Sequence, residues 1–402
     1  MGQLKKLKIS NVRVVLDTMR KHHKCSKKYI SQITGLSSAL LTNICNELKE
    51  KELIIEGGYV NSEKPGRREI QMDINYDFKK IIGINISSEY CDIVISDLKP
   101  SLLYHKKIFT HSFENELLLM DNIFHTINEY VLSKKLKWSN FIGIGITSKG
   151  TIDSVNGFVG IDFFNNKFSI KEYLYQKTNL PIFIENDVKA LAITQNFFFP
   201  QYDEFFLVKY SIHGIGGAIF KDGHLYTNQD NMVGKIGHLI IDPTKDYCPV
   251  CKRRGCLESL ISLLNLKKEI HEKFKNNKIP ILTNLLQNNF DNFSIPLLFQ
   301  AAQDGSIEIH NILKKSASMM AQAIINSYVI AGSNKIVLYG DFFNFPLYLF
   351  LLESYIKEYQ LTSFWDKISI SSLNNTQEYL ASCVLVINNI FNTHLEEYYT
   401  KI

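Results

Sequence analysis

The pattern of hydrophobic and polar positions divides the chain into a short helical head and a longer body in which strands and helices alternate. Near the start, a helical stripe is formed by Val12, Val15, Leu16 and Met19. Ser26 can cap a second, short helix that buries Ile30 and Ile33. Gly35 then supplies a tight turn.

Ser37 can cap a third helix, and two short helices joined by a glycine-containing turn form a helix-turn-helix. Its inner face is Leu41, Ile44 and Leu48. Its outer face presents short polar side chains that can hydrogen-bond base edges or phosphates: Ser38, Thr42, Asn43 and Asn46. Together with Ser37, these residues are the predicted DNA contacts of the helix.

Two strands are predicted next, over residues 52–60 and 67–74, with "NSEKPG" as the tip between them. A helix-turn-helix followed by such a hairpin is a winged helix. In the wing, Lys64, Arg67 and Arg68 are suited to phosphate or minor-groove contact.

The body, beyond residue 76, alternates between strands and helices, which indicates an α/β fold with mixed sheets. Three successive strands are expected within residues 79–110, then a helix over 117–135 and a strand over 141–150. The segment "LPIFIEND" predicts a strand that ends in polar residues, and a helix follows it. Residues 205–226 resemble a hairpin around a glycine-rich turn, and helices dominate residues 258–330 before a strand at 334–342.

Charge separates the same two regions. The net charge of the chain is +5, but residues 1–70 carry 14 Lys/Arg and 7 Asp/Glu, which gives +7. The remaining residues carry 31 basic and 33 acidic side chains, which gives −2. A cationic head on a neutral body indicates a polyanion-binding domain. A solvated basic face, or a small helical domain that binds protein, is the alternative.

Cysteine usage and hydropathy predict a cytoplasmic protein. The N-terminus "MGQLKKLKIS" has no apolar signal segment, and no apolar run approaches the ~20 residues of a membrane span. Seven cysteines without a secretion signal do not make a disulfide framework.

Three of the cysteines cluster with a histidine as His238-x9-Cys248-x2-Cys251-x4-Cys256. Such a set fills a tetrahedral site and leaves no position for water, so it predicts a structural Zn²⁺. Three reduced cysteines in a loop are the alternative.

These motifs resemble the ROK family, named for repressors, open reading frames and kinases, and especially its members that repress xylose and N-acetylglucosamine operons. The matching segments are "PGRREIQMDIN", "IENDVKALA", "GIGGAIFKDGHLY", "VGKIGHLIIDP", "CKRRGCLES" and "IVLYGD". The resemblance implies an N-terminal winged helix-turn-helix followed by a two-lobed, actin-like (ribonuclease-H-like) sugar-kinase fold. The implied domains are the DNA-binding head (1–75), lobe 1 (76–190, completed by a C-terminal helix at 376–402) and lobe 2 with the zinc loop (191–375).

The resemblance also implies a sugar site between the lobes. In the kinases the position of Asp187 is the catalytic base and a sugar ligand, here beside Asn186. His238 and Glu258 match two further sugar-binding positions, and Gly150 matches a glycine at which backbone approaches the sugar.

The nucleotide elements depart from the family pattern. Asn85 stands where the kinases have an acidic residue, and Ser87 and Ser88 replace glycines of the first phosphate loop. Asn85 lacks the charge that organises magnesium, and the two serines crowd a backbone that must close on phosphate. The second loop, Gly214, Gly216 and Gly217, is intact, whereas Tyr339 replaces a small residue where the family's adenosine lies. We therefore expect that Asp187 is only a vestigial base and that phosphotransfer is lost.

Lys235 replaces the glutamate of the family's "G-E-x-G-H" motif. An ammonium only donates hydrogen bonds, whereas a carboxylate accepts them. Lys235 either pairs with Asp187 or Glu258, recruits an anionic ligand such as a sugar phosphate, or points to solvent. Lys149 could add positive charge to the same pocket. In the metal loop the family shows Cys-x-Cys rather than Cys-x2-Cys, and a glycine in place of Lys252.

The sequence thus predicts a cytoplasmic DNA-binding regulator, a repressor of a carbohydrate-utilisation operon, controlled by a sugar or sugar phosphate. We expect a homodimer or homotetramer on a palindromic double-stranded DNA operator. An active kinase with an appended DNA-binding head, and a regulator whose effector is a protein or is absent, are the rival hypotheses.

Overall fold

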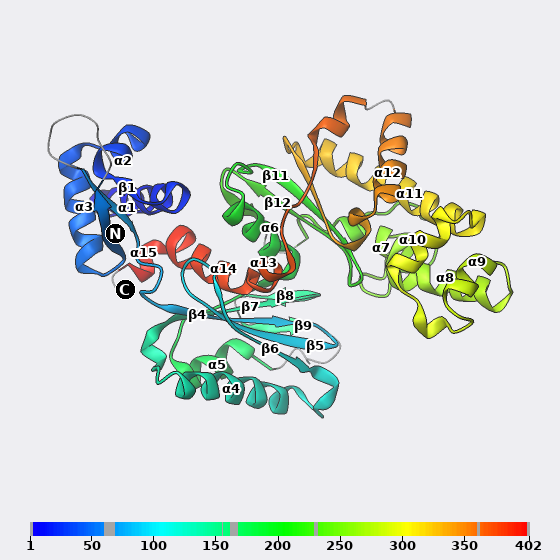
Figure 1. The fold of residues 1–402 in the computed structure, drawn as a ribbon, viewed down its shortest axis with the longest axis horizontal. Helices are drawn as coiled ribbons and strands as arrows, with labels where there is room; N and C mark the ends of the chain where they lie inside the picture. The colour runs from blue at the N-terminus through cyan, green and yellow to red at the C-terminus, as the bar shows by residue number, and fades with distance from the viewer. Residues whose placement is uncertain are drawn as a thin grey trace. The chain divides into compact units, whose positions relative to one another are not determined.

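The computed structural model describes residues 3–59, 69–154, 156–160, 168–228, 232–359 and 362–399. The chain forms two compact units (Figure 1). Unit 1 is Met1–Pro200 with Asn374–Ile402, and unit 2 is Gln201–Leu373. Each unit is built around its own five-stranded sheet.

Unit 1 begins with a small head, defined here as residues 3–74. Its elements are α1 (Gln3–His22), β1 (Cys25–Ser26), α2 (Lys27–Thr34), α3 (Ser38–Glu50), β2 (Ile54–Tyr59) and β3 (Ile70–Ile74). The strands form an antiparallel sheet in the order β1-β3-β2. The region between β2 and β3, residues 60–68, lies outside the described residues.

Local sequence signals set the helix ends in the head. The Ser26 hydroxyl accepts the N–H of Tyr29 at the start of α2, and the Ser37 hydroxyl accepts the N–H of Leu40 at the start of α3. Gly35 ends α2 with φ of 71°, a left-handed conformation that favours glycine. The two predicted caps, and the turn predicted at Gly35, are confirmed.

The core of the head contains the predicted stripe of α1 together with Ile30, Leu41, Ile44 and Leu48. The prediction that Ile33 is buried is wrong, because this side chain is 54% exposed. Helix α2 has only eight residues and packs on α1 and α3, so only the face that carries Ile30 is covered.

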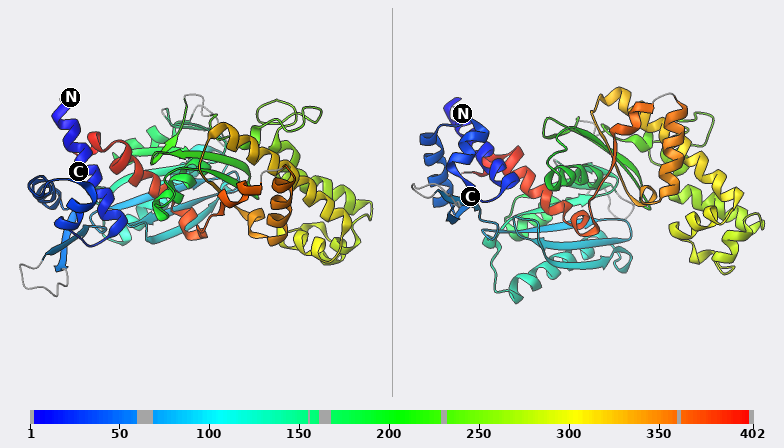
Figure 2. Two further views of the ribbon diagram at one scale, coloured as in Figure 1. Left: turned by 90° about the horizontal axis from the view of Figure 1, so that it is seen from above. Right: turned by 45° about the horizontal axis from the view of Figure 1, so that its top comes forward.

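The head core is completed by a segment far away in the sequence. Leu395 and Tyr399, from the region of α15 (Leu395–Tyr398), are buried among residues of α1, α3 and β2. Figures 1 and 2 show α15, in red, against the blue helices of the head. The last described residues of the chain therefore anchor its first domain.

The rest of unit 1 is a mixed sheet with helices on both faces. Its strands, in the order β10-β7-β4-β5-β6, are β4 (Lys80–Ile86), β5 (Tyr90–Ser96), β6 (Leu102–Phe109), β7 (Phe141–Ser148) and β10 (Ile182–Asn186). A separate hairpin joins β8 (Thr151–Asp153) and β9 (Phe158–Gly160). One face is covered by α4 (Glu116–Ser133) and α5 (Ile170–Thr178), and the other by α6 (Asp187–Phe198) and the C-terminal helices.

The C-terminal segment, expected as one helix over 376–402, is divided into shorter pieces. These are α13 (Asn375–Tyr379), α14 (Ala381–Ile387), a π-helical turn η7 (Asn388–Thr393) and α15. Helix α14 is buried along its whole length against β4, β7 and α6. The π turn redirects the chain from this buried position to the head.

Unit 2 contains a second mixed sheet, in the order β13-β12-β11-β14-β15. Its strands are β11 (Phe205–Ser211), β12 (Gly214–Lys221), β13 (His224–Tyr226), β14 (Ile336–Tyr339) and β15 (Ile368–Ile370). Its helices are α7 (Leu257–Ile261), α8 (Leu263–Lys275), α9 (Pro280–Leu285), α10 (Ile295–Gln303), α11 (Ile307–Ala331) and α12 (Pro346–Glu358). They pack with β11 and β14 into a large apolar core.

Among the described residues, no helix is both long and apolar enough to span a membrane.

Candidate functional site

The outer face of α3 is exposed and polar. Ser37, Ser38, Thr42, Asn43 and Asn46 are all exposed, while Leu41, Ile44 and Leu48 of the opposite face are buried. The Ser37 hydroxyl is engaged as a cap, and the Thr42 hydroxyl donates to the Ser38 carbonyl at 2.9 Å. Asn43 and Asn46 therefore offer side-chain donors and acceptors to a groove without sacrificing a cap. The predicted wing contacts Lys64, Arg67 and Arg68 lie outside the described residues.

In unit 1, three predicted sugar-site residues gather at one edge of the sheet. Strands β7 and β10 are parallel, with Ser148 opposite Asn186, so their carboxyl ends meet there. Gly150 follows β7 with φ of 84°, and its carbonyl accepts the side-chain N–H of Asn186 at 3.4 Å. Asp187 is half-buried in the first turn of α6, where the helix dipole favours a negative charge.

Asn186 also organises the start of α6, because its side-chain oxygen accepts the N–H of Val188 at 3.1 Å. One side chain therefore joins the loop after β7 to the helix after β10. This double engagement fixes the orientation of the amide and places Asp187 next to the loop of Gly150.

An ion pair that the sequence pattern did not predict lies beside these residues. Lys189 is buried, and its Nζ lies 3.9 Å from Oε1 of Glu185. Burial raises the pKa of the Glu185 carboxyl, although Lys189 and the N–H of Asn186 act in the opposite direction. The i, i+4 spacing of a glutamate and a lysine was the available signal, but it crosses a strand end and a helix start, where sequence spacing alone does not establish a contact.

The Asn85 side chain is bound at both ends. Its amide N–H donates to the Tyr379 carbonyl at 2.8 Å, and its oxygen accepts the Thr147 hydroxyl at 2.7 Å. The residue thereby joins β4, β7 and the end of α13. The uncharged Asn85 side chain thus links these elements by hydrogen bonds and is not available as a ligand for a cation.

The turn after β4 is closed by its own hydrogen bonds. The Ser87 hydroxyl donates to the Tyr90 carbonyl at 2.8 Å, and the Ser87 N–H donates to the same oxygen at 2.9 Å. The Ser88 carbonyl accepts the Thr110 hydroxyl. The two bonds of Ser87 occupy donors that a phosphate-binding turn would have to offer to a ligand.

A buried carboxylate lies across the ladder from Asn85 but is already paired. Asp92 is directly opposite Asn85 on β5, and its Oδ1 lies 2.7 Å from Nε2 of His105. His105 in turn stacks on the ring of Tyr379, with centroids 4.7 Å apart. The arrangement gives Asp92 a structural role within this sheet.

In unit 2, the predicted glycine-rich turn has a different structure. Gly214, Gly216 and Gly217 lie within β12, and the turn is formed by Ile212 and His213. A Cβ at Gly217 would approach Phe206 to 2.8 Å and the Gly234 carbonyl to 2.7 Å. Close packing therefore explains this glycine without a phosphate. Tyr339 lies at the end of β14, with the ammonium of Lys209 6.0 Å from its ring centroid.

Glu258 is held against β12. Its Oε2 accepts the N–H of Ile215 at 2.7 Å, and a Cβ at Gly214 would lie 2.7 Å from its Oε1. A Cβ added at Gly237 would lie 3.0 Å from Oε2 of the same carboxylate. Burial raises the pKa of Glu258 to about 7, against the opposing N–H of Ile215.

Lys235 precedes the short 3₁₀ helix η3 (Ile236–His238) and is half-buried. Burial lowers the pKa of His238, and the charges of Lys235 and Arg253 lower it further. Lys235 therefore acts electrostatically on His238, and a neutral imidazole is the form that binds metal.

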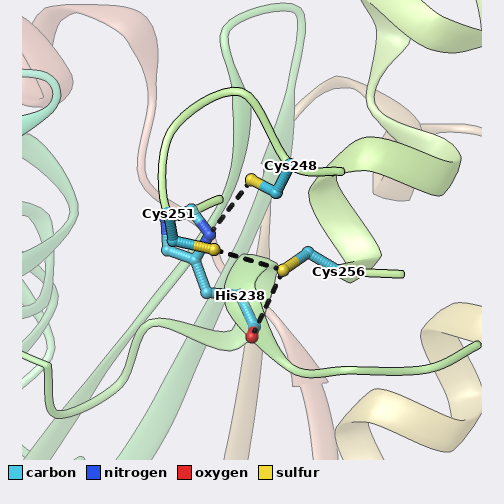
Figure 3. Close-up of side chains that lie close together, drawn as sticks. All are labelled: His238, Cys248, Cys251 and Cys256. Carbon is cyan, nitrogen blue, oxygen red and sulfur yellow. Dashed lines mark hydrogen bonds between the residues drawn. The ribbon is translucent and has the colours of Figure 1, made fainter. Parts of the chain in front are cut away.

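His238, Cys248, Cys251 and Cys256 converge, with their ligand atoms all within 4.8 Å of one another (Figure 3). Sγ of Cys248 lies 3.7 Å from Nδ1 of His238, and Sγ of Cys251 lies 3.4 Å from Sγ of Cys256. Zn–S bonds of about 2.3 Å place tetrahedral thiolates about 3.8 Å apart, so the four donors fit one zinc ion. Cys248 belongs to the cluster with the other three predicted ligands.

The loop that carries the thiols depends on unusual backbone positions. Lys252 has φ of 60° where the family has glycine, and its N–H donates to the Cys248 carbonyl at 2.9 Å. Gly255 has φ of 69°, and a Cβ there would lie 1.7 Å from the Asp242 carbonyl oxygen. Burial opposes deprotonation of Cys251, but hydrogen bonds from Arg253 lower the pKa of this thiol to about 7.

Comparison with known proteins matches this arrangement to one family. The model of the ROK family matches residues 81–388. The xylose repressor of Caldicellulosiruptor bescii is 26% identical over 98% of this chain and 99% of its own length.

Solved structures share the fold. The crystal structure of a ROK family transcriptional regulator, a homologue of the E. coli MLC protein, superimposes with a TM-score of 0.82 at 21% identity. It covers 98% of this chain and 100% of the other, so the likeness includes the head. The ROK hexokinase of Thermus thermophilus gives a TM-score of 0.61 at 19% identity, over 76% of this chain and 97% of the kinase.

Proposed function

The chain belongs to the ROK family, and from that premise we propose that it is a DNA-binding transcriptional repressor of a carbohydrate-utilisation operon. Its full-length similarity to a xylose repressor supports this function, and makes D-xylose the first sugar to test. The effector is a sugar or sugar derivative, and the reaction of the family's kinases is absent.

The N-terminal domain (1–75), which includes the head, is the winged helix-turn-helix that contacts the operator. The exposed polar face of α3 is the observation that carries this proposal: Asn43 and Asn46 are exposed on a helix whose other face is buried. Side-chain amides read base edges in the major groove. The +7 charge of residues 1–70 supplies the attraction to phosphate, with Lys64, Arg67 and Arg68 as the wing contacts.

The effector is recognised by Gly150, Asn186 and Asp187 of unit 1 and by Lys235, His238 and Glu258 of unit 2. The amide and the carboxylates suit sugar hydroxyls, and the ammonium of Lys235 suits an acidic or phosphorylated sugar. Binding changes operator affinity only if the sugar has different affinities for the DNA-competent and DNA-incompetent states.

Loss of phosphotransfer is supported by the bonding of Asn85. A side chain committed to Tyr379 and Thr147 is neutral and occupied, whereas magnesium-nucleotide binding needs a carboxylate there. The hydrogen bond from the Ser87 hydroxyl to the Tyr90 carbonyl also supports the loss of phosphotransfer, because it occupies a donor of the phosphate-binding turn.

The four converging donors hold a structural zinc ion when it is bound. Zinc would fix the loop of residues 238–256 against the start of α7, which carries Glu258. His238, Cys248, Cys251 and Cys256 supply a complete tetrahedral set, so the metal has a scaffolding role.

Two copies form a homodimer, or two dimers a homotetramer, so that two heads meet the half-sites of a palindromic operator. The protein acts in the cytoplasm, where its DNA lies and where thiols stay reduced.

A mobility-shift experiment tests the function. Full-length protein is titrated onto duplexes from the regions upstream of neighbouring genes, at 50 and 200 mM salt. A panel of D-xylose, D-glucose, N-acetyl-D-glucosamine and glucose 6-phosphate is then added. We expect a specific shift that one of these sugars reverses, and no sugar-dependent release of ADP from ATP. Sugar-dependent ADP release would establish the kinase instead.

A further inference from the structure

Helix α6 spans the distance between a proposed effector site and the head. Its first turn carries Asp187, with Asn186 as its cap, and its last turn carries Phe197. Twelve residues give a length of about 18 Å. Residues 188–195 are buried, and the helix packs against α14. A helix enclosed in this way moves as a rigid element rather than bending.

Arg20 of the head binds the far end of this helix. Its Nη1 donates to the Phe197 carbonyl at 3.0 Å, and its guanidinium carbon lies 4.9 Å from the centre of the Phe197 ring. The other two nitrogens, Nε and Nη2, donate to Oδ1 of Asp17 at 3.3 and 2.8 Å. The guanidinium thus links α1 to a terminal carbonyl of α6, and its side chain is only 14% exposed.

The head has two kinds of attachment to the rest of unit 1. One is apolar, where Leu395 and Tyr399 are buried in the head core. The other is polar, at Arg20 and Phe197, and it borders empty space. A pocket of about 200 Å³ lies beside it, lined by Arg20, Phe197 and Tyr76 among others, and a cavity of about 40 Å³ adjoins the same three residues.

The larger pocket opens to the surface beside Arg20 and Lys21, so the guanidinium has room to change its geometry. The smaller cavity is also lined by Leu16, Leu53 and Phe391, so it borders the apolar attachment as well. The π turn η7, just before α15, is a further irregularity between the two attachments.

We propose that α6 and Arg20 transmit effector occupancy at Asn186 and Asp187 to the DNA-binding head. This coupling rests on the proposed function, since it assumes a sugar at the amino end of α6 and DNA at α3. A shift of α6 on sugar binding moves the Phe197 carbonyl, and the guanidinium turns α1 about the apolar anchor at Leu395. Arg20 is a positioning residue that touches neither ligand.

The test compares Arg20→Met with Lys21→Met in the full chain. Lys21 is a matched control, because its Nζ also pairs with Asp17, at 2.8 Å, and it borders the same pocket. Within the part of the chain that the structure describes, Lys21 has no hydrogen bond or ion pair to α6. The probe is a mixture of the four panel sugars, and the readout is the ratio of operator Kd with and without it.

We expect at least a tenfold ratio for the wild type and for Lys21→Met, and less than twofold for Arg20→Met. Sugar binding by DNA-free Arg20→Met stays within threefold of the wild type. Because coupling is reciprocal, operator DNA weakens sugar binding in the wild type but not in Arg20→Met.

Arg20→Lys is the control for a folding defect in Arg20→Met. Its thermal unfolding temperature should equal that of the wild type. It keeps the charge beside Asp17, but one ammonium cannot reproduce the planar fork that reaches both Asp17 and Phe197, so it also loses the coupling. If either Arg20 variant keeps the full wild-type ratio, the coupling through α6 is overturned while the proposed function stands. A wild type that binds operator but ignores the sugars overturns the effector proposal, and the coupling with it.

Discussion

Asn85 and Tyr379 are joined by a hydrogen bond of 2.8 Å between the amide N–H of the one and the carbonyl oxygen of the other. This bond ties β4 to the end of α13, the first piece of the C-terminal segment. It uses the position at which the kinases of the family carry an acidic residue, and it requires a donor that a carboxylate lacks.

Asn85→Asp therefore does not recreate a kinase but weakens unit 1. An aspartate would direct a negative oxygen at the Tyr379 carbonyl, and we expect a loss of about 1–3 kcal/mol in the free energy of unfolding. Urea unfolding followed by circular dichroism gives that value, and a coupled assay gives the rate of ADP release, expected to equal that of a blank without protein.

Asn115→Asp is the matched control for this change. Asn115 caps α4 only as an acceptor, from the N–H of Leu118, and aspartate caps equally well. We expect a change below about 0.5 kcal/mol. Equal destabilisation by the two variants would show that the donor of Asn85 contributes nothing.

Zinc content should depend on the four clustered donors His238, Cys248, Cys251 and Cys256. We expect one zinc per chain by mass spectrometry of the native protein, and none after Cys251→Ser or Cys256→Ser, because a tetrahedral site loses a thiolate ligand. Cys91→Ala removes a buried thiol from unit 1 and should keep the zinc. Full zinc content in Cys251→Ser would show that this residue is not a ligand.

Gly255→Ala should disrupt the metal loop by steric overlap. The added Cβ would lie 1.7 Å from the Asp242 carbonyl oxygen, so we expect a loss of about 3 kcal/mol or more and a lower affinity for zinc. Gly223→Ala shares the left-handed backbone, with φ of 75°, but has no atom within 4 Å of the new Cβ. Its cost should be only about 1 kcal/mol. Thermal unfolding and competition with a zinc-binding dye separate the two variants.

Asn43→Ala should weaken operator binding without changing stability. Loss of an amide that reads a base costs about 1–3 kcal/mol, or roughly 5- to 150-fold in Kd. Asn284→Ala, at an exposed helical position of unit 2, should leave operator Kd unchanged. Fluorescence anisotropy with labelled operator measures both, and equal Kd for Asn43→Ala and the wild type would remove Asn43 from the DNA interface.

The features that the sequence predicted correctly depend on neighbours along the chain. Caps at Ser26 and Ser37 involve residues three positions away, and the metal cluster lies within nineteen residues, so spacing alone located them. The exposed position of Ile33 was not predictable in this way, since burial on a two-turn helix depends on which face its neighbours cover.

Long-range packing explains the other differences. Glycine richness alone predicts a turn at Gly214 and Gly217, whereas the structure places both within β12. A side chain is excluded at Gly214 by Glu258 and at Gly217 by Gly234, and both of these neighbours are distant along the chain. Likewise, nothing in the sequence around Asn85 indicates that its amide is bound to Tyr379, almost three hundred residues later.

The burial of Leu395 in the head core also affects the order of events during synthesis. The ribosome makes α1 early, but roughly 370 further residues must follow, which takes about 20–75 s at ordinary elongation rates. Until then the apolar face that receives Leu395 and Tyr399 is bare, and the nascent head lacks part of its core. A ribosome-bound chain stalled before residue 395 should therefore be cleaved by protease within α1 and α3, whereas the released protein resists.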